Sequence, residues 1–572
     1  MQECLRGISL RLEGQGIGVG GHPTGYGAHL GYSEKGGERT ALRKKSSATR
    51  LWWLAASVLA VASSAFAQSV IPADPVSVES VRFAEVYGIL EANYVDAIDP
   101  DRAILEGGVR GMLSTLDPFS SFFNPDQFEL LKQQEQGKAL GFGSILYVQP
   151  GKVTILETRE NSPSARAGLG PGDEIVEVNG TRLDRLDFQS LVELLEKSRS
   201  QPVSLAVLHP GKIVPVEFKL DPAEVALPTV DKSFMAAPGI AYVHLAGFEE
   251  KTPAEIAAAL DRLDAQKLQG LILDLRDNPG GMVNSAVETA SLFLNPDTPI
   301  LTVRGRVVPE KTYRTAPAAE RFDVPLLLMV NGNTASAAEI LVAALEENDR
   351  ALVVGEPTYG KGVVENVIPI GEKCGLALIT AQYLTSRGRS IQRALPGTEL
   401  AQAVVGGENS AAAKGAGPEA RTAAGRPLSF GGGIVPDVEI PSPPLDPWLV
   451  FLNGRGFFTD FASEYLTRHG RPDQSFEPDV AVLGEFKDFL HHQGIRTPDE
   501  YWFPDQARLR VRIRTEVINL VFGLAAGDEI ETRADPEVQK AIPLFPELSK
   551  SLRAPQEKPG ANHLRAVSKE KQ

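Results

Sequence analysis

Cysteine is nearly absent from this sequence, which has two in 572 residues. Cys4 lies in an N-terminal leader described below, so removal of that leader would leave Cys374 as the only thiol. A chain with one thiol cannot form an internal disulfide, and its stability must come from its hydrophobic cores. Because nothing near Cys374 looks like a paired histidine, we interpret it as a strand residue and not as a nucleophile.

Histidine, the usual proton acceptor of a nucleophilic serine, is also scarce. Most of the eight histidines lie in the leader or in the C-terminal tail: His22, His29, His469, His491, His492 and His563. His209 lies in a β-rich module, and only His244 lies in the α/β region, within a strand where packing is its expected role. A nucleophilic serine in this chain would therefore need another base.

Basic residues are fewer than acidic ones. The chain has 58 Lys and Arg residues against 73 Asp and Glu residues, a net charge of -15 and a pI near 5.2. This balance argues against nucleic acid or an anionic membrane surface as the main partner. The composition is otherwise that of a globular protein, and the length predicts two to four domains.

The long hydrophobic run of the leader is LWWLAASVLAVAS, and it is too short for a confident membrane span. Four basic residues precede it and a small-residue site follows: Arg43, Lys44, Lys45, Arg50, and Ala65-Phe66-Ala67. This order predicts a secretory signal within residues 1–67 and an extracytoplasmic, periplasmic or secreted protein. Anchoring to the inner membrane by an uncleaved signal stays open.

Residues 68–137 are predicted to form an N-terminal helical region. Apolar residues recur at helical spacing in residues 81–94, and two more helical stretches follow at 101–116 and 125–136. The expected role of this region is packing or self-association.

Residues 138–221 have a different character, with short alternating strands, Gly and Pro turns and one helix, DFQSLVELLEKS. The module begins with a glycine-rich loop that runs into a strand: Gly141, Phe142, Gly143, Ser144 and Ile145. Such a loop can offer several backbone N–H groups to a carboxylate, and the strand after it can pair with a peptide. This pattern predicts a peptide-binding module.

Residues 222–440 are predicted to form an α/β core, because nearly apolar strands alternate with helices, as in buried and largely parallel sheets. Within them, residues 397–429 are small, polar and aperiodic, which predicts a mobile insertion. The C-terminal extension, 441–572, has helical patterns near 446–468, 480–492 and 505–525 and no catalytic constellation.

Ser336 lies between the buried strand LLLMV and the helix AEILVAALEE. The ordinary interpretation of a serine there is a helix N-cap. The position also suits a nucleophile, because a helix N-terminus stabilises negative charge and the N–H of Ala337 would point at a developing oxyanion.

Lys361 lies in GEPTYGKG, which nearly matches a phosphate-binding loop. That interpretation needs Ser or Thr after the lysine and then a helix, whereas residue 362 is Gly and the following pattern predicts a strand. A solvated turn lysine is the ordinary alternative. As a general base, Lys361 would need a pKa lowered by burial, and the flanking glycines would let the backbone wrap tightly around it.

The stretch DLRDNPGG, residues 274–281, supplies a glycine pair between a strand and a helix. Gly280 or Gly281 could provide a second oxyanion N–H, although the sequence also reads as an ordinary turn.

Two resemblances follow from these residues. GFGSI followed by SPSARAGLGPGDEIVEVNG resembles a PDZ domain. The whole set resembles the C-terminal processing peptidases, also called tail-specific proteases, through LDPFSSFF, the PDZ run, DLRDNPGG, NTASAAEI, GEPTYGKG, GRSIQ and GGGIVPD. This resemblance implies a crotonase-like α/β protease core with an inserted PDZ domain, Ser336 as nucleophile and Lys361 as base. It implies no cofactor and no metal, and protein substrates with apolar C-terminal tails; an adaptor protein and a homo-oligomer stay open.

Two residues depart from the family pattern. Glu365 stands where the family commonly has a Gln that orients the lysine, and Phe119 stands where it has His. An ionised Glu365 would favour the ammonium form of Lys361, whereas a protonated one would behave like Gln. The expected function is an exported serine endopeptidase with a shifted pH optimum, or one idle until a tail docks. The alternatives are a tail-binding scaffold with an impaired site and, least favoured, a nucleotide-dependent enzyme.

Overall fold

The computed structural model describes residues 75–135, 138–317, 321–371, 373–394, 420–429, 431–444, 446–496, 502 and 506–548. The predicted signal lies outside these ranges. Within them, no helix combines the length and the apolar character that crossing a membrane would require. The chain divides into two compact units, of which the smaller contains residues up to 115 and the larger contains the chain from Leu116 onward.

The smaller unit is helical where it is described. It contains α2 (Pro75–Asn93), the π-helix η1 (Asp101–Val109) and α3 (Arg110–Leu113). The predicted helices at 81–94 and 101–116 are confirmed, with α2 beginning six residues earlier than its apolar pattern indicates. A role in packing or self-association stays a prediction.

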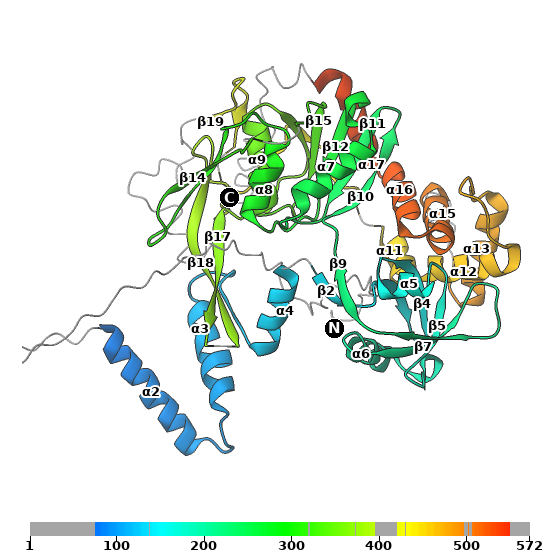
Figure 1. The fold of residues 1–572 in the computed structure, drawn as a ribbon, viewed down its shortest axis with the longest axis horizontal. Coiled ribbons are helices and arrows are strands. Elements are labelled where there is room, and N and C mark those ends of the chain that lie inside the picture. Colours follow the sequence, from blue (N-terminus) through cyan, green and yellow to red (C-terminus); the bar gives the residue numbers. More distant parts are fainter. Residues whose placement is uncertain are drawn as a thin grey trace, which may run out of the picture. The chain divides into compact units, whose positions relative to one another are not determined.

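The β-rich module forms a sheet in the order β3-β4-β5-β7-β8, with β6 paired to β5 (Figure 1). Its elements are β3 (Ser144–Gln149), β4 (Lys152–Thr158), α5 (Pro163–Ala167), β5 (Glu174–Val178), β6 (Thr181–Arg182), η2 (Leu183–Arg185), α6 (Phe188–Ser198), β7 (Val203–Leu208) and β8 (Val216–Leu220). Leu191 of α6 packs in the core of the module with Val153 and Val178. The two ends of the module, β2 (Lys138–Gly141) and β9 (Ala223–Ala226), pair with each other, so the module is inserted through a two-stranded ribbon.

The α/β core is built on a second sheet, in the order β10-β11-β12-β15-β16-β21. Its strands are β10 (Val230–Ala237), β11 (Ile240–Leu245), β12 (Gly270–Asp274), β15 (Leu326–Val330), β16 (Ala351–Gly355) and β21 (Val438–Glu439). All neighbours are parallel except β10 and β11. One face is covered by α7 (Thr252–Arg262), α8 (Val283–Ser291) and α9 (Ala337–Glu347), with η3 (Ala265–Lys267) following α7. The predicted α/β class is therefore confirmed.

A third sheet lies beside this core. It contains β1 (Ser121–Phe123), β13 (Pro299–Arg304), β14 (Lys311–Arg314), β17 (Val363–Ile370) and β18 (Cys374–Thr385). The helix α4 (Pro125–Glu135) follows β1. Cys374 lies at the start of β18, which confirms its interpretation as a strand residue, and β17 confirms the strand predicted after Lys361.

The predicted mobile insertion 397–429 needs a correction at its end. Residues 420–429 are described, and they contain a short hairpin of β19 (Ala420–Arg421) and β20 (Pro427–Leu428). The buried guanidinium of Arg426 pairs with Asp349 and Asp437. Both partners lie outside the segment, whose own small residues contain no periodic signal. The earlier residues of the insertion lie outside the described ranges.

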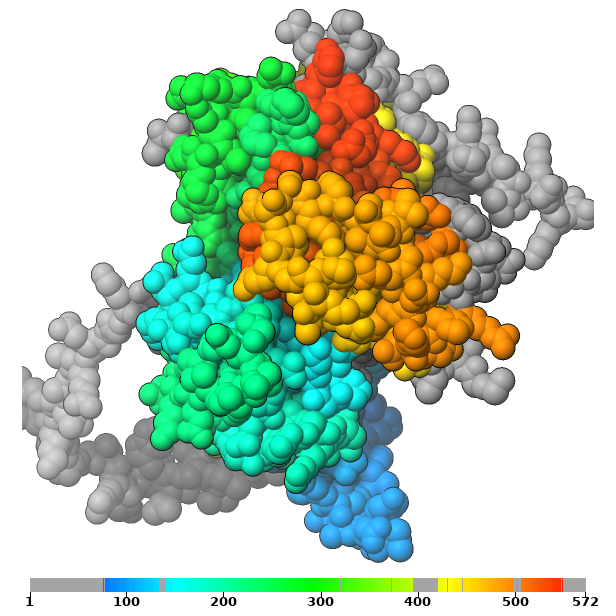
Figure 2. All heavy atoms as spheres, turned by 90° about the vertical axis from the view of Figure 1, so that its right-hand side faces the viewer, coloured from blue at the N-terminus to red at the C-terminus, as the bar shows by residue number. Residues whose placement is uncertain are grey.

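The C-terminal extension is helical, as predicted. It contains α11 (Pro447–Gly454), α12 (Phe457–His469), α13 (Val480–His492), α15 (Gln506–Phe522), α16 (Leu524–Ala534), α17 (Pro536–Ala541) and η5 (Ile542–Glu547). Its first helices share a hydrophobic cluster with Ile145 and Tyr147 of β3, and Gln149 donates a hydrogen bond to Asp460. Figure 2 shows the yellow and orange helices of the extension against the cyan β-rich module.

The end of the extension covers the second face of the core sheet. Val538 and Ala541 of α17 pack with Ile272 of β12 and with Leu327 and Met329 of β15, all of them buried. Strands that read as continuously apolar need cover on both faces. The extension is therefore the third layer of the α/β core, which its sequence pattern did not reveal.

Candidate active site

Ser336 lies between β15 and α9, where the sequence placed it. Its backbone has φ 54° and ψ -116°, a conformation that is strained for a residue with a Cβ atom. The residue is buried, with 6% of its surface exposed. The fold thus holds this hydroxyl-bearing residue at a helix N-terminus in an unfavourable backbone conformation, as often occurs at functional positions.

The Glu339 carboxylate joins the turn of Ser336 to the turn of Lys361. Its Oε2 accepts hydrogen bonds from the backbone N–H groups of Ser336 and Lys361, each at 2.9 Å. Its Oε1 accepts from Gly360 N at 2.8 Å and from the Thr358 hydroxyl at 2.5 Å. Complete burial raises the pKa of Glu339, although these four donors favour the ionised form.

The Tyr383 hydroxyl makes a second link between the same two residues. It lies 2.8 Å from the carbonyl oxygen of Lys361 and 3.2 Å from that of Ser336, so both accept from one donor. Tyr383 comes from β18 and is buried. Together, Glu339 and Tyr383 bring Ser336 and Lys361 to one place at the carboxyl end of the core sheet.

The side chain of Lys361 is buried, with 3% of its surface exposed, so it is not a solvated turn lysine. Its Nζ donates to Glu365 Oε2 at 3.0 Å and lies 4.8 Å from the centre of the Phe119 ring. Glu365 is equally buried, and this burial raises its pKa despite the opposing effect of Lys361. Glu365 and Phe119, the two residues that depart from the family pattern, therefore both contact the Lys361 amine.

Glycines around Lys361 allow this close packing. Gly360 has φ 88°, and a Cβ atom on it would lie 2.9 Å from Gly433 N. A Cβ atom on Gly362 would lie 2.8 Å from Gln392 N, and Gln392 Oε1 accepts a hydrogen bond from Gly362 N. The motifs GRSIQ and GGGIVPD thus enclose the lysine turn. The chain then enters β17 and not a helix, so the phosphate-loop geometry is missing here.

The DNPGG turn packs directly against the nucleophile candidate. A Cβ atom on Gly280 would lie 2.8 Å from Ser336 Cβ and 2.9 Å from Ala337 N. The N–H of Gly280, however, already donates to Asn278 Oδ1 at 2.8 Å. Of the two glycines proposed as oxyanion donors, Gly280 is therefore engaged in this structure, and Gly281 and Ala337 remain the candidates.

The glycine-rich loop of the β-rich module lies between β2 and β3, and its role in binding a carboxylate stays a prediction. Gly143 has φ 75°, and the loop carbonyls of Phe142 and Gly143 accept from Ser164 N and Arg159 N. Among the described strands, β3 pairs only with β4, so its other edge lies at the end of the sheet. The side chain of Ile145 packs against the C-terminal extension, and pairing of its backbone with a peptide stays a prediction.

Sequence reasoning missed Glu339, Tyr383 and Gln392. The spacing Ser336-x-x-Glu339 is that of a capping box and could have pointed to Glu339. Gln392 lies within the quoted GRSIQ, whereas Tyr383 is one aromatic residue in a strand and carries no local signal.

Comparisons with known proteins identify the family of the chain. Residues 239–399 match the model of Peptidase family S41, and residues 154–208 match that of the PDZ domain. The carboxy-terminal processing protease CtpB of Bacillus subtilis is 30% identical over 54% of this chain and 65% of its own length, slightly less than two thirds. The carboxy-terminal-processing protease of Bartonella bacilliformis is 30% identical over 54% of this chain, and that of Synechocystis is 32% identical over 53%. Each of these two matches spans 72% of the relative. The chain therefore belongs to the carboxy-terminal processing proteases, serine-type peptidases of family S41.

Proposed function

We propose that this chain is an exported serine endopeptidase that binds C-terminal tails through its PDZ domain and cleaves peptide bonds with Ser336 and Lys361. The observation that carries the proposal is the double link between these residues, through Glu339 Oε2 and through the Tyr383 hydroxyl. The Lys361 side chain is buried and its Nζ is held by Glu365, so it is a fixed group of the site and not a solvated surface lysine.

In the first step, Ser336 Oγ attacks the scissile carbonyl carbon and its proton passes to a neutral Lys361 Nζ. The carbonyl π-bond electrons move to oxygen, and the N–H groups of Gly281 and Ala337 are suited to stabilise that oxyanion. Collapse of this tetrahedral intermediate breaks the C–N bond, and the proton on Lys361 goes to the leaving amine. Water then attacks the Ser336 ester with Lys361 again as base, which releases the carboxylate product and restores the hydroxyl.

Glu365 is proposed to orient Lys361. Its Oε2 lies 3.0 Å from Nζ, and a protonated carboxyl would hold a neutral amine as an amide does. The raised pKa of Glu365 favours that protonated form. An ionised carboxylate would instead favour the ammonium and oppose catalysis. Activity should therefore depend on the protonation of this pair.

The PDZ domain is proposed to capture the substrate tail. The N-terminal end of β3 follows the glycine-rich loop, and the edge of β3 that pairs with no described strand is suited to pair with an extended peptide whose carboxylate meets the loop. Recognition of apolar C-terminal tails and export to the periplasm are parts of the proposal, the latter from the leader pattern.

The test is degradation of a folded reporter protein with an apolar C-terminal tail. The wild type should degrade it, whereas Ser336→Ala and Lys361→Ala should not, and all three should bind the tail peptide equally. A wild type as inert as both variants that still binds the tail would replace the proposal by the scaffold function. Reporter degradation by Lys361→Ala at the wild-type rate would remove Lys361 as the base.

A further inference from the structure

The turn Asp274–Gly281, here called the catalytic turn, packs against Ser336 through Gly280. It is held at several points along its length. The side-chain amide of Asn278 donates a hydrogen bond to Leu245 O at 2.6 Å, and its backbone carbonyl oxygen accepts one from Ala335 N at 3.0 Å. The carboxylate of Asp277 accepts from the side-chain amides of Asn331 and Asn333. These contacts all involve residues of the α/β core.

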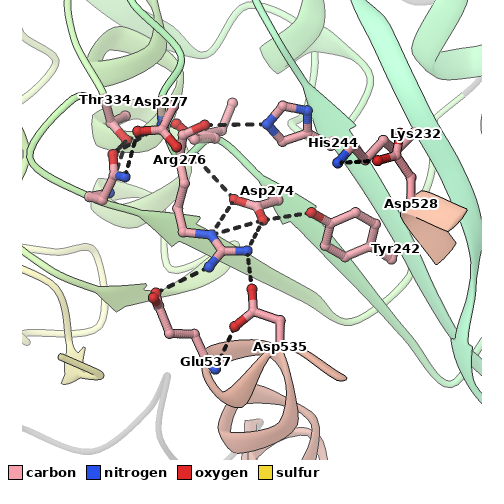
Figure 3. A network of polar contacts seen from close by, with 12 residues as sticks. Lys232, Tyr242, His244, Asp274, Arg276, Asp277, Thr334, Asp528, Asp535 and Glu537 are labelled. Atoms are coloured by element: carbon pink, nitrogen blue, oxygen red, sulfur yellow. Dashed lines mark hydrogen bonds and ion pairs between the residues drawn. The ribbon is translucent and has the colours of Figure 1, made fainter. Parts of the chain in front are cut away.

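Arg276 provides a different kind of attachment, because it reaches the C-terminal extension. Its Nη2 lies 2.8 Å from Asp535 Oδ2 and its Nη1 lies 3.2 Å from Glu537 Oε2 (Figure 3). The same guanidinium donates to both carboxylate oxygens of Asp274, at 2.6–3.0 Å. Figure 3 shows the three carboxylates around one guanidinium, two of them from residues more than 250 positions later in the sequence.

Most of this cluster is buried. Asp274 and Glu537 are buried, and only 15% of the Arg276 side chain is exposed. Burial alone would disfavour the charged forms, yet the carboxylates raise the pKa of Arg276, and Arg276 holds the pKa of Asp274 below its usual value. Tyr242 adds a hydrogen bond to Asp274 Oδ2 at 2.7 Å. Arg276 is thus held by hydrogen bonds to Asp274 and by ion pairs with Asp535 and Glu537.

The two carboxylates are themselves fixed to the core. Asp535 caps α17 by accepting from Glu537 N at 2.8 Å, and α17 packs its Val538 and Ala541 under the core sheet. A shift of α17 would therefore be transmitted to Arg276, five residues before Gly281. Catalytic donors must be held to within a fraction of an ångström, since small displacements cost large factors in rate.

We propose that Asp535 and Glu537 of the C-terminal extension are positioning residues, which hold Arg276 and thereby aim the catalytic turn at the oxyanion. The extension is then a working part of the peptidase site, although it lies outside residues 239–399 that match the family model. This inference rests on the proposed function, and it adds to it residues that do not touch substrate.

The test uses a double variant, Asp535→Asn with Glu537→Gln. Both substitutions keep the size of the side chain. Asn caps a helix as well as Asp does, so α17 should stay folded. The control is Glu531→Gln, which removes another carboxylate of the extension, paired with Arg512 at 2.7 Å. Five quantities are measured: kcat and KM for the reporter, the affinity of a peptidyl boronic acid that forms a tetrahedral adduct on Ser336, the affinity for the tail peptide, and Tm.

The double variant should lower kcat and weaken boronic acid affinity by about 10- to 100-fold, the range expected for a misplaced oxyanion donor. KM and tail-peptide binding should stay within about twofold, since the turn is proposed to act on the oxyanion of the transition state. The control should match the wild type. The saturating amplitude of boronic acid binding counts folded sites, so unfolded protein lowers that amplitude and not the affinity.

The inference is overturned if the wild type is active and the double variant matches it in kcat and boronic acid affinity. It is also overturned if kcat falls while boronic acid affinity stays unchanged. An inactive wild type would overturn the proposed function itself, so the two failures are distinguishable.

Discussion

Ser336 and Lys361 donate their backbone N–H groups to one oxygen, Oε2 of Glu339, at 2.9 Å each. A single buried carboxylate therefore sets the separation of the two turns that bear the proposed nucleophile and base. It acts on the backbone and leaves both side chains available for chemistry.

The first prediction concerns this carboxylate. Glu339→Gln replaces an oxygen that accepts hydrogen bonds by an NH2 group, which leaves buried backbone donors unpaired. Each unpaired buried group costs about 1–3 kcal/mol, so the free energy of unfolding should fall by at least that amount. Urea unfolding measures it, and peptidase activity should fall with it. Glu288→Gln on α8, where Glu288 is exposed, is the matched control. Equal stability of the two variants would contradict the bridging role.

The second prediction concerns stability against pH. Burial raises the pKa of Glu365 above its unfolded value of about 4.3. Between those two values the folded state binds more protons than the unfolded state, so the free energy of unfolding contributed by Glu365 falls as pH rises. Glu365→Gln lacks this titration. The free energy of unfolding of the variant minus that of the wild type should therefore increase from about pH 4 upward. A constant or decreasing difference would show that the pKa is not raised.

The same variant tests the catalytic role of the pair. An ionised carboxylate next to Lys361 favours the ammonium, and glutamine does not. Glu365→Gln should therefore move the acid limb of kcat against pH to lower pH. Superimposable profiles of variant and wild type would refute any role for the carboxylate.

The third prediction uses the backbone strain at Ser336. Its φ of 54° with ψ of -116° suits glycine better than any residue with a Cβ atom. Ser336→Gly and Ser336→Ala should both lack peptidase activity, but the glycine variant should be more stable than the alanine variant by about 1 kcal/mol. Thermal unfolding of the two inactive proteins measures this. A more stable alanine variant would contradict the strain.

The fourth prediction compares two glycines with similar backbones. Gly360 has φ 88° and would bring a Cβ atom to 2.9 Å from Gly433 N, whereas Gly432 has φ 81° and open space at its Cβ position. Both alanine variants bear the cost of the positive φ, so their difference isolates the steric clash. Gly360→Ala should be less stable than Gly432→Ala by about 1–3 kcal/mol and should lose most of its activity. Similar stabilities would mean that the lysine turn tolerates displacement.

Local patterns were sufficient to predict the class of the fold and to locate the two residues proposed as nucleophile and base. Continuously apolar strands followed by helices indicate a buried parallel sheet, and Ser336 at a strand-to-helix junction follows from that alternation. Glycine on both sides of Lys361 indicates a tightly wrapped turn. These signals are readable because each depends on residues only a few positions apart.

Tertiary structure alone decided the rest. Tyr383 links Ser336 to Lys361 only because β18 returns beside the core, and Gly280 loses its free N–H to Asn278 only in the folded turn. The extension supplies the third layer of the core and the partners of Arg276, although its own sequence shows no more than amphipathic helices. Contacts between distant segments depend on packing and on shared hydrogen-bond partners, and these leave no periodic trace in either segment. The sequence by itself therefore determined which elements form and where the reactive side chains lie along the chain, and the fold determined what surrounds them.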